Sequence, residues 1–171
     1  LPASANVVVI GGGIIGTSVA YHLGKSGISN VVLVEQSTLT SGTTWHAAGL
    51  MTTFGSLSST SIAWRQYTKE LYSTILPNET QFETGFQDIG FIEVATSPDY
   101  VHYFQRVAAL NRFYGIHVEE LTPTNASNNN NTTRSNWLHE YCPIIETTDV
   151  LRGFYVPTDG RGNPTDVTMA M

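Results

Sequence analysis

The sequence has little that would support disulfide, metal or nucleic-acid chemistry. Its single cysteine, Cys142, excludes an internal disulfide framework and a cysteine-rich zinc or iron–sulfur site within these residues. The eight lysines and arginines are scattered and the formal net charge is −6, so no basic stripe is present to meet a phosphate backbone. No apolar run reaches the length of a membrane span, and no signal peptide precedes the first predicted strand. We therefore expect a soluble chain in a reducing compartment, without nucleic-acid, membrane or metal partners.

What the sequence does contain is a glycine-rich turn after an apolar run. Residues 7–10 read Val-Val-Val-Ile, which predicts a strand buried on both faces. Gly11, Gly13 and Gly16 follow in G-x-G-x-x-G spacing, which lets a strand turn sharply, approach a pyrophosphate and pack closely against the next helix. That helix, expected over residues 14–25, would present its first backbone N–H groups and its positive dipole end to the phosphates.

A second apolar run completes a βαβ unit that ends on an acid. Residues 31–34 predict another strand, and Glu35 lies nineteen positions after Gly16. A carboxylate at that place accepts both hydroxyls of an adenosine ribose. A glutamate without a nearby arginine argues against a 2′-phosphate, so the pattern favours FAD or NAD over NADP. The competing interpretation is a glycine turn in some other βαβ unit.

Directly after that acid comes a loop of small and hydroxylated residues, 36–50. Ser41, Thr43 and Thr44 could offer hydroxyl groups to the pyrophosphate or the ribityl chain of a cofactor that runs along it. On composition alone, the stretch is also compatible with an ordinary surface loop.

The rest of the chain alternates between helical and extended patterns. Apolar periodicity predicts half-buried helices at residues 61–76 and 99–114. A further helix is expected to start at Thr165, with Thr165 or Asp166 as its cap. The predicted strands are residues 90–95, a short strand that begins with Ile116 and Val118, and residues 153–157.

The organisation suggests an incomplete domain. Residues 122–136 are asparagine-rich and low in apolar surface, which predicts a surface insertion. A doubly wound dinucleotide domain needs more parallel strands than one βαβ unit supplies. We therefore interpret residues 1–171 as the amino-terminal part of one domain and expect it to fold poorly when expressed alone. The predicted fold class is α/β, a Rossmann-like unit followed by the start of an inserted antiparallel-sheet portion.

Three stretches resemble the amino-terminal part of the sarcosine and dimethylglycine dehydrogenases, which are D-amino-acid-oxidase-like flavoproteins. They are residues 7–35, the Leu-Thr-Ser-Gly-Thr-Thr-Trp-His-Ala-Ala-Gly-Leu segment at 39–50, and the segment from Tyr155 to Ala170, which contains Pro-Thr-Asp-Gly-Arg-Gly-Asn-Pro. The Thr-Trp-His-Ala-Ala-Gly sequence is the most specific of these. The closing segment is a landmark of the family, and no chemistry is assigned to it.

The resemblance implies a covalently bound FAD, attached through its 8α-methyl group to His46. Without the family, His46 would be read as a structural histidine in a glycine-rich loop. No catalytic residue can be assigned within the chain. The residues expected by the same match to bind or line the cofactor are Gly11, Gly13, Ile14, Ile15, Gly16, Glu35, Gln36, Gly42, Thr43, Thr44, Trp45, His46, Ala47, Ala48, Gly49 and Leu50.

The function that this resemblance implies is oxidative demethylation of an N-methyl glycine, sarcosine or dimethylglycine, by hydride transfer to the flavin. It further implies tetrahydrofolate in a carboxy-terminal domain and electron-transfer flavoprotein as an acceptor. The expected location is the mitochondrial matrix in a eukaryote or the cytoplasm in a bacterium.

Two alternatives remain. One is a non-catalytic relative that resembles the regulatory subunit of pyruvate dehydrogenase phosphatase, which shares the opening Leu-Pro-Ala-Ser-Ala. The other is an oxidase with noncovalent FAD. The resemblance implies that the regulatory subunit lacks the tryptophan–histidine pair, so the intact Trp45–His46 pair favours an enzyme.

Overall fold

The computed structural model describes residues 2–123 and 137–171, and these residues divide into two compact units. The first unit comprises residues 1–51, 68–87 and 161–171, and the second comprises residues 52–67 and 88–160. The insertion predicted at 122–136 lies outside the described residues from residue 124 onward.

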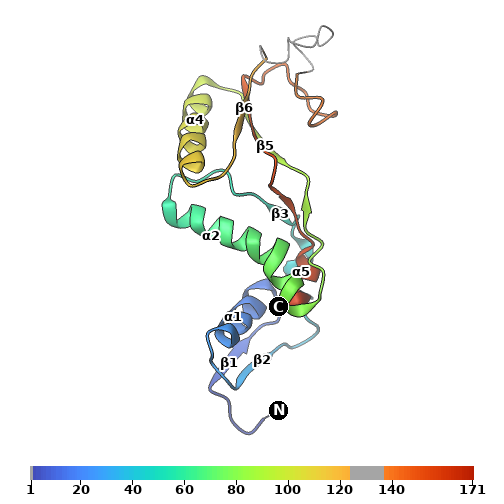
Figure 1. Cartoon of the computed structure of the whole chain (residues 1–171). Coiled ribbons are helices and arrows are strands. Elements are labelled where there is room, and N and C mark those ends of the chain that lie inside the picture. The colour runs from blue at the N-terminus through green and yellow to red at the C-terminus, as the bar shows by residue number, and fades with distance from the viewer. Residues whose placement is uncertain (1, 124–136) are drawn as a thin grey trace. The chain divides into compact units, whose positions relative to one another are not determined.

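The first unit begins with the predicted βαβ arrangement (Figure 1). Strand β1 (Val7–Ile10), helix α1 (Ile14–Lys25) and strand β2 (Val31–Val34) have the predicted bounds. The two strands pair in parallel, from Val7 opposite Val31 to Ile10 opposite Val34. A parallel pair needs a crossover connection, which α1 supplies by packing on both strands.

The prediction that β1 is buried on both faces is wrong within this chain. The Val8 and Ile10 side chains are 56% and 86% exposed, whereas those of Val7 and Val9 are half-buried. Helix α1 packs on the β1–β2 pair, and among the described residues nothing buries Val8 and Ile10 in the same way. Continuous apolar runs of this kind belong to sheets covered on both sides, so the pattern indicates a covering layer that the described residues do not supply.

The predicted helix at 61–76 is longer and less regular than expected. Helix α2 (Ser59–Glu70) leads into a π-helical turn over Leu71–Ile75, and α3 (Leu76–Thr80) then continues past residue 76, where the predicted helix ends. Pro77 is the second residue of α3, in the first turn, where a missing N–H is tolerated.

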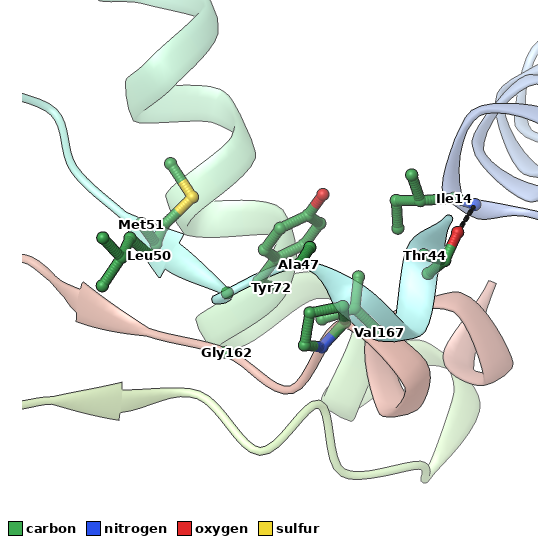
Figure 2. Close-up of a pocket in the computed structure, with 10 residues that line it drawn as sticks. Ile14, Thr44, Ala47, Leu50, Met51, Tyr72, Gly162 and Val167 are labelled. Atoms are coloured by element: carbon green, nitrogen blue, oxygen red, sulfur yellow. Dashed lines mark hydrogen bonds between the residues drawn. The ribbon is translucent and has the colours of Figure 1, made fainter. Parts of the chain in front are cut away.

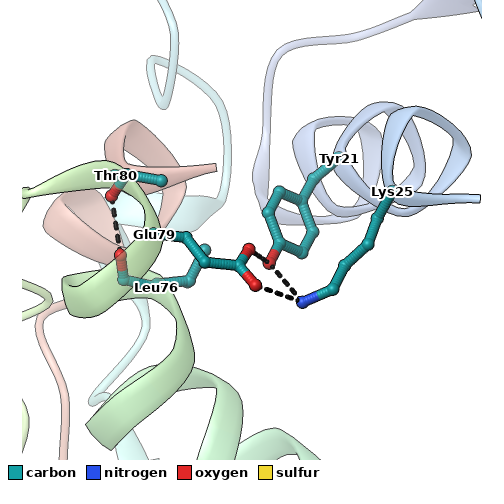
Figure 3. A network of polar contacts seen from close by, with 5 residues as sticks. All are labelled: Tyr21, Lys25, Leu76, Glu79 and Thr80. Atoms are coloured by element: carbon teal, nitrogen blue, oxygen red, sulfur yellow. Dashed lines mark hydrogen bonds and ion pairs between the residues drawn. The ribbon is translucent and has the colours of Figure 1, made fainter.

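Polar contacts join α1 to α3 within the first unit (Figure 3). The Lys25 ammonium lies 2.7 Å from a Glu79 carboxylate oxygen, and the Tyr21 hydroxyl donates to the other oxygen at 2.5 Å. The core beside them brings together α3, the π-helical turn and α5 (Pro164–Ala170). Its buried members are Leu71, Leu76, Val167 and Ala170.

Helix α5 starts one residue earlier than predicted, and its cap differs. The side chain of Asn163, rather than Thr165 or Asp166, accepts hydrogen bonds from the N–H groups of Thr165 and Asp166 at 3.0 and 3.4 Å. Pro164 then occupies the first helical position, which suits its fixed φ and its lack of a donor. The predicted cap residues are therefore the donors in this cap.

The second unit contains an antiparallel sheet, ordered β5 (Phe91–Ala95), β7 (Arg152–Val156) and β6 (Glu119–Leu121). Helix α4 (Pro98–Phe113) packs on this sheet (Figure 1). The short strand expected from Ile116 instead begins at Glu119, and Ile116 and Val118 are buried in the core that also includes residues of α4. The antiparallel portion predicted from the sequence is confirmed.

Three strands of two residues each complete the described elements. They are β3 (Leu50–Met51), β4 (Gln87–Asp88) and β8 (Gly160–Arg161), in the order β3-β8-β4. The predicted α/β class, with a parallel start and antiparallel strands after it, is thus the observed one.

Candidate cofactor site

The turn between β1 and α1 can be closed only by glycine. The Gly11 N–H donates to the Val34 carbonyl at 2.8 Å, and its φ of +109° lies in the region that favours glycine. A Cβ atom on Gly16 would collide with the Gly11 carbonyl oxygen. Around Gly11 itself, a Cβ would meet nothing within 4 Å. The turn is therefore tightly packed on its helix side and open at Gly11, as a backbone that approaches a ligand must be.

The first turn of α1 is capped from a distant part of the chain. Its N-cap residue, Gly13, offers no side-chain acceptor. Instead, the Thr44 hydroxyl accepts a hydrogen bond from the Ile14 N–H at 3.1 Å, and a Cβ on Gly13 would lie 3.0 Å from that hydroxyl oxygen. Ile15 beside it is 78% exposed. The glycine turn and the loop after Glu35 thus form one site around the positive end of α1.

Glu35 also reaches the glycine turn. One carboxylate oxygen accepts from the Gly12 N–H at 2.7 Å, and the other accepts from the Ser37 N–H at 3.0 Å. These two bonds, that from Gly12 above all, hold the pKa of Glu35 below its usual value. Each carboxylate oxygen has a second lone pair, so the group can still accept ribose hydroxyls. Gln36, the neighbour predicted at the ribose, is exposed beside it.

The loop that follows is held over the glycine turn by its backbone. The Thr40 N–H donates to the Gly12 carbonyl at 3.0 Å, and Thr40 is buried with a φ of +69°, an uncommon conformation for a β-branched residue. A 3₁₀ turn then runs from Thr44 to His46. Gly42, Thr43 and Ala48, also predicted at the cofactor, are exposed along this loop.

Trp45 and His46 lie on the open side of that turn. Their rings contact each other, with centroids 3.7 Å apart at 56°. The Trp45 side chain is 60% exposed, and His46 is exposed too. That His46 binds the cofactor, and is not only a structural histidine of a glycine-rich loop, stays a prediction.

Behind the 3₁₀ turn, the first unit contains a hollow of about 170 Å³ (Figure 2). Nearly all of its wall is apolar, and it is formed by the loop, the start of α1, the π-helical turn and α5. The predicted cofactor residues that line it are Ile14, Thr44, Ala47, Gly49 and Leu50, and the residues that sequence reasoning missed are Met51, Tyr72, Gly162, Pro164 and Val167.

Some of the residues that sequence reasoning missed lie in a recognisable sequence segment, and others do not. Gly162 and Pro164 belong to the closing segment of the family resemblance, so their place near the loop that follows Glu35 could have been inferred. The Gly162 N–H donates to the Gly49 carbonyl at 2.9 Å, and Gly49, at φ +72°, has no room for a Cβ beside the Gly162 carbonyl. Nothing in the sequence distinguishes Tyr72 from the other aromatic residues of its helix.

The closing segment also contains a buried carboxylate, within the second unit. Asp159 is fully buried and accepts from the Thr53 N–H and hydroxyl, each at 2.7 Å, and from the Thr52 hydroxyl at 3.0 Å. No chemistry was assigned to Asp159 from the sequence, and its contacts are those of a structural acceptor.

Two classes of site are not found in the described part of the chain. No group of three or more His, Cys, Asp or Glu side chains in it could hold a metal ion. No described helix is both long enough and apolar enough to cross a bilayer.

The sequence of this chain is similar to a known protein family and to several characterised proteins. A family model described as FAD dependent oxidoreductase matches residues 6–171. Mitochondrial sarcosine dehydrogenase of Mus musculus is 35% identical over 96% of this chain and 16% of its own length. Mitochondrial dimethylglycine dehydrogenase of Rattus norvegicus is 36% identical over 98% of this chain and 18% of its own length. The mitochondrial pyruvate dehydrogenase phosphatase regulatory subunit of Mus musculus is 35% identical over 100% of this chain and 18% of its own length. The chain therefore spans less than a fifth of these relatives.

Solved structures agree on the fold. L-proline dehydrogenase from P. horikoshii superposes with a TM-score of 0.80 at 25% identity, over 99% of this chain and 41% of that protein. Glycine oxidase from Geobacillus kaustophilus superposes with a TM-score of 0.73 at 24% identity, over 96% and 42% respectively.

Proposed function

Because the chain belongs to the family of FAD-dependent oxidoreductases, we propose that its protein oxidises the N-methyl group of an N-methyl glycine, sarcosine or dimethylglycine. The relatives named for these two substrates match nearly the whole chain at about equal identity. That similarity supports the substrate class and does not separate the two compounds.

The residues of the first unit fit the cofactor. Gly11 leaves open space at the turn, the start of α1 offers positive backbone dipole, and Glu35 retains acceptor capacity. We assign the pyrophosphate to the glycine turn and the adenosine ribose to Glu35 and Gln36. The span from Gly42 to Leu50 would line the remainder. When bound, FAD supplies the acceptor for the hydride equivalent, and the protein contributes binding, orientation and exclusion of water.

The observation that carries the proposal is the exposed Trp45–His46 pair within the loop that follows Glu35. A histidine held in a turn next to the helix that binds the cofactor can be joined to it covalently, as the family resemblance implies. We propose His46 as the attachment site. The substrate's neutral amine would lose hydride from its N-methyl carbon, and water or tetrahydrofolate would take up the resulting iminium outside this chain.

Electron-transfer flavoprotein is the acceptor that we propose for the reducing equivalents. Because the relatives of this class are mitochondrial by name, we also propose a mitochondrial location. Both proposals concern the whole protein, because this chain spans less than a fifth of the relatives on which they rest.

A non-catalytic role is the second candidate, favoured by one observation. The phosphatase regulatory subunit matches 100% of this chain, and its identity of 35% is about that of the dehydrogenases. The intact Trp45–His46 pair argues for the enzyme instead, because a regulatory surface has no need of a flavin-attachment histidine.

The deciding experiment uses the protein as its source organism produces it. The protein is denatured in acid, run on a denaturing gel and inspected for flavin fluorescence in its band, beside His46→Ala and the control His102→Ala, an exposed histidine of the second unit. We expect fluorescence in the wild type and in His102→Ala, and none in His46→Ala. Flavin released by acid from the wild type would refute covalent attachment, and absence of flavin from the native protein would favour the regulatory role.

A further inference from the structure

The loop that carries His46 is held at two points, one on each side of the histidine. Before it, the Thr44 hydroxyl accepts a hydrogen bond from the Ile14 N–H at 3.1 Å. After it, the Gly49 carbonyl accepts a hydrogen bond from the Gly162 N–H at 2.9 Å. These points lie two residues before and three residues after His46, so the path of the backbone at the histidine depends on both.

The second point is a tight contact with the closing segment, to which no chemistry was assigned from the sequence. Gly49 has a φ of +72°. A Cβ atom on it would collide with the Gly162 carbonyl oxygen and would lie 3.2 Å from a ring carbon of Pro164. The closing segment therefore fixes the backbone of Gly49, and only glycine fits there.

The closing segment is itself held by Thr84, a residue that no motif of the sequence includes. The Thr84 carbonyl accepts a hydrogen bond from the Asn163 N–H at 3.0 Å, and its hydroxyl donates to the Tyr72 carbonyl in the π-helical turn at 2.6 Å. Thr84 is 1% exposed, so water does not replace a lost bond there. Thr84 thus ties the neighbour of Gly162 to the helical segment of the first unit.

Gly85 borders the same contact. Its φ is +63°, and a Cβ atom on it would lie 2.9 Å from the Cβ atom of Asn163. Cβ atoms do not approach other atoms so closely, so a side chain at position 85 would displace Asn163. The contact between Thr84 and the closing segment therefore depends on a glycine on each side, at 49 and at 85.

Attachment of FAD to a histidine depends on where the imidazole lies. The imidazole nitrogen replaces one hydrogen of the 8α-methyl group, and the hydrogens of both groups leave as protons. Two electrons stay on the flavin, and dioxygen takes up these electrons and both protons as hydrogen peroxide. Reacting atoms must lie about 3–3.5 Å apart, and a misplacement of about 1 Å costs roughly a hundredfold in rate.

We propose that Thr84 is a positioning residue for His46. Through Asn163 and Gly162 it fixes Gly49, and with Gly49 the place of the imidazole relative to the cofactor. Thr84 acts through the backbone and not by contact with the cofactor. The inference rests on the proposed function, since it requires that His46 is the attachment site of FAD. It goes beyond that function by giving Thr84 and the closing segment a role in the attachment.

The test removes one buried hydroxyl group at a time. Thr84→Val removes the group that reaches the Tyr72 carbonyl. Thr168→Val is the matched control, because Thr168 is also 1% exposed and its hydroxyl donates within α5, to the Pro164 carbonyl at 2.7 Å. The full-length protein is produced without riboflavin and incubated with FAD at a series of concentrations. Acid-stable flavin in the protein band is followed over time, and the thermal midpoint of each flavin-free protein is measured.

We expect Thr84→Val to lower the rate of attachment at saturating FAD about tenfold or more, because the imidazole is then less often in place. The FAD concentration that gives half the maximal rate should stay within about twofold of the wild-type value, since binding itself is not altered. Thr84→Ser restores the hydroxyl group and should recover the wild-type rate. Thr168→Val should keep that rate, even where its thermal midpoint falls as far as that of Thr84→Val.

A second pair of variants decides the matter where Thr84→Val does not fold. Gly85→Ala places a methyl group against Asn163, whereas Gly115→Ala places one at a φ of +83° where nothing lies within 4 Å. Both glycines are exposed, so the two variants share the strain of a positive φ and differ in the contact with Asn163. Gly85→Ala should slow the attachment, and Gly115→Ala should not.

The outcomes separate this inference from the proposed function. A wild-type protein that binds no flavin, or that releases all of it in acid, overturns the proposed attachment and the inference with it. Where the wild type holds acid-stable flavin, an unchanged rate in Thr84→Val, or in Gly85→Ala if Thr84→Val does not fold, overturns only the inference. A slow Thr84→Ser, or an equal loss of rate in Thr168→Val, overturns it too, because the effect is then one of folding and not of placement.

Discussion

At the scale of single residues, Asp159 is the side chain whose role the sequence concealed. Its carboxylate is fully buried and accepts three hydrogen bonds from Thr52 and Thr53, all of them 3.0 Å or shorter. These donors belong to the segment that directly follows strand β3. A buried carboxylate with several donors is costly to remove, because each donor then loses its partner in a place that water does not reach.

We therefore expect Asp159→Ala to lower the free energy of unfolding by about 3 kcal/mol, the cost of leaving several buried donors unpaired. Urea unfolding followed by tryptophan fluorescence measures this. The control is Asp149→Ala, which removes an exposed carboxylate from the same unit and should change the free energy by less than about 0.5 kcal/mol. Equal effects of the two substitutions would show that the hydrogen bonds of Asp159 contribute nothing specific.

At the scale of elements, helix α1 has two glycines with opposite requirements. A Cβ on Gly16 would overlap the Gly11 carbonyl, whereas one on Gly24 would meet nothing within 4 Å. Gly16→Ala should therefore destabilise the protein by about 2 kcal/mol and reduce its flavin content, because the turn must open to admit the methyl group. Gly24→Ala should stabilise it by about 0.5–1 kcal/mol, since alanine loses less backbone freedom in a helix. Denaturant unfolding of both variants, with flavin content beside it, checks the pair; a Gly16→Ala protein as stable as Gly24→Ala would contradict this packing.

The same elements show what could be predicted from the sequence. The βαβ unit was predicted with its bounds because periodicity, glycine spacing and the acid at Glu35 are all local signals. The cap at Asn163 and the continuation of the helix past Pro77 were missed, because each depends on a geometry that single-residue preferences do not encode. The hollow was missed for a stronger reason. Its wall joins Ala47 to Tyr72 and Val167, and no local pattern brings such distant residues together.

At the scale of the whole molecule, the cofactor residues and the antiparallel sheet fall in different units. Every residue predicted to bind FAD lies in the first unit. The second unit carries the β5-β7-β6 sheet with α4. This division agrees with the predicted fold class, in which a parallel βαβ unit is joined to antiparallel strands. That residues 1–171 form the amino-terminal part of a single domain stays a prediction.

The exposed apolar surface of the first unit leads to a prediction for the isolated chain. Ile10, Ile15 and Leu50 are 86%, 78% and 70% exposed, and all three lie at or beside the cofactor site and its strand. A sheet of two parallel strands with one bare face cannot bury enough apolar area to offset the entropy lost on ordering. We expect the 171-residue chain, expressed alone, to bind a hydrophobic dye and to melt without a cooperative heat-absorption peak in calorimetry. The protein as its source organism produces it should melt cooperatively. A sharp calorimetric peak from the isolated chain would show that its two units are self-sufficient, and that the bare face of β1 needs no covering layer.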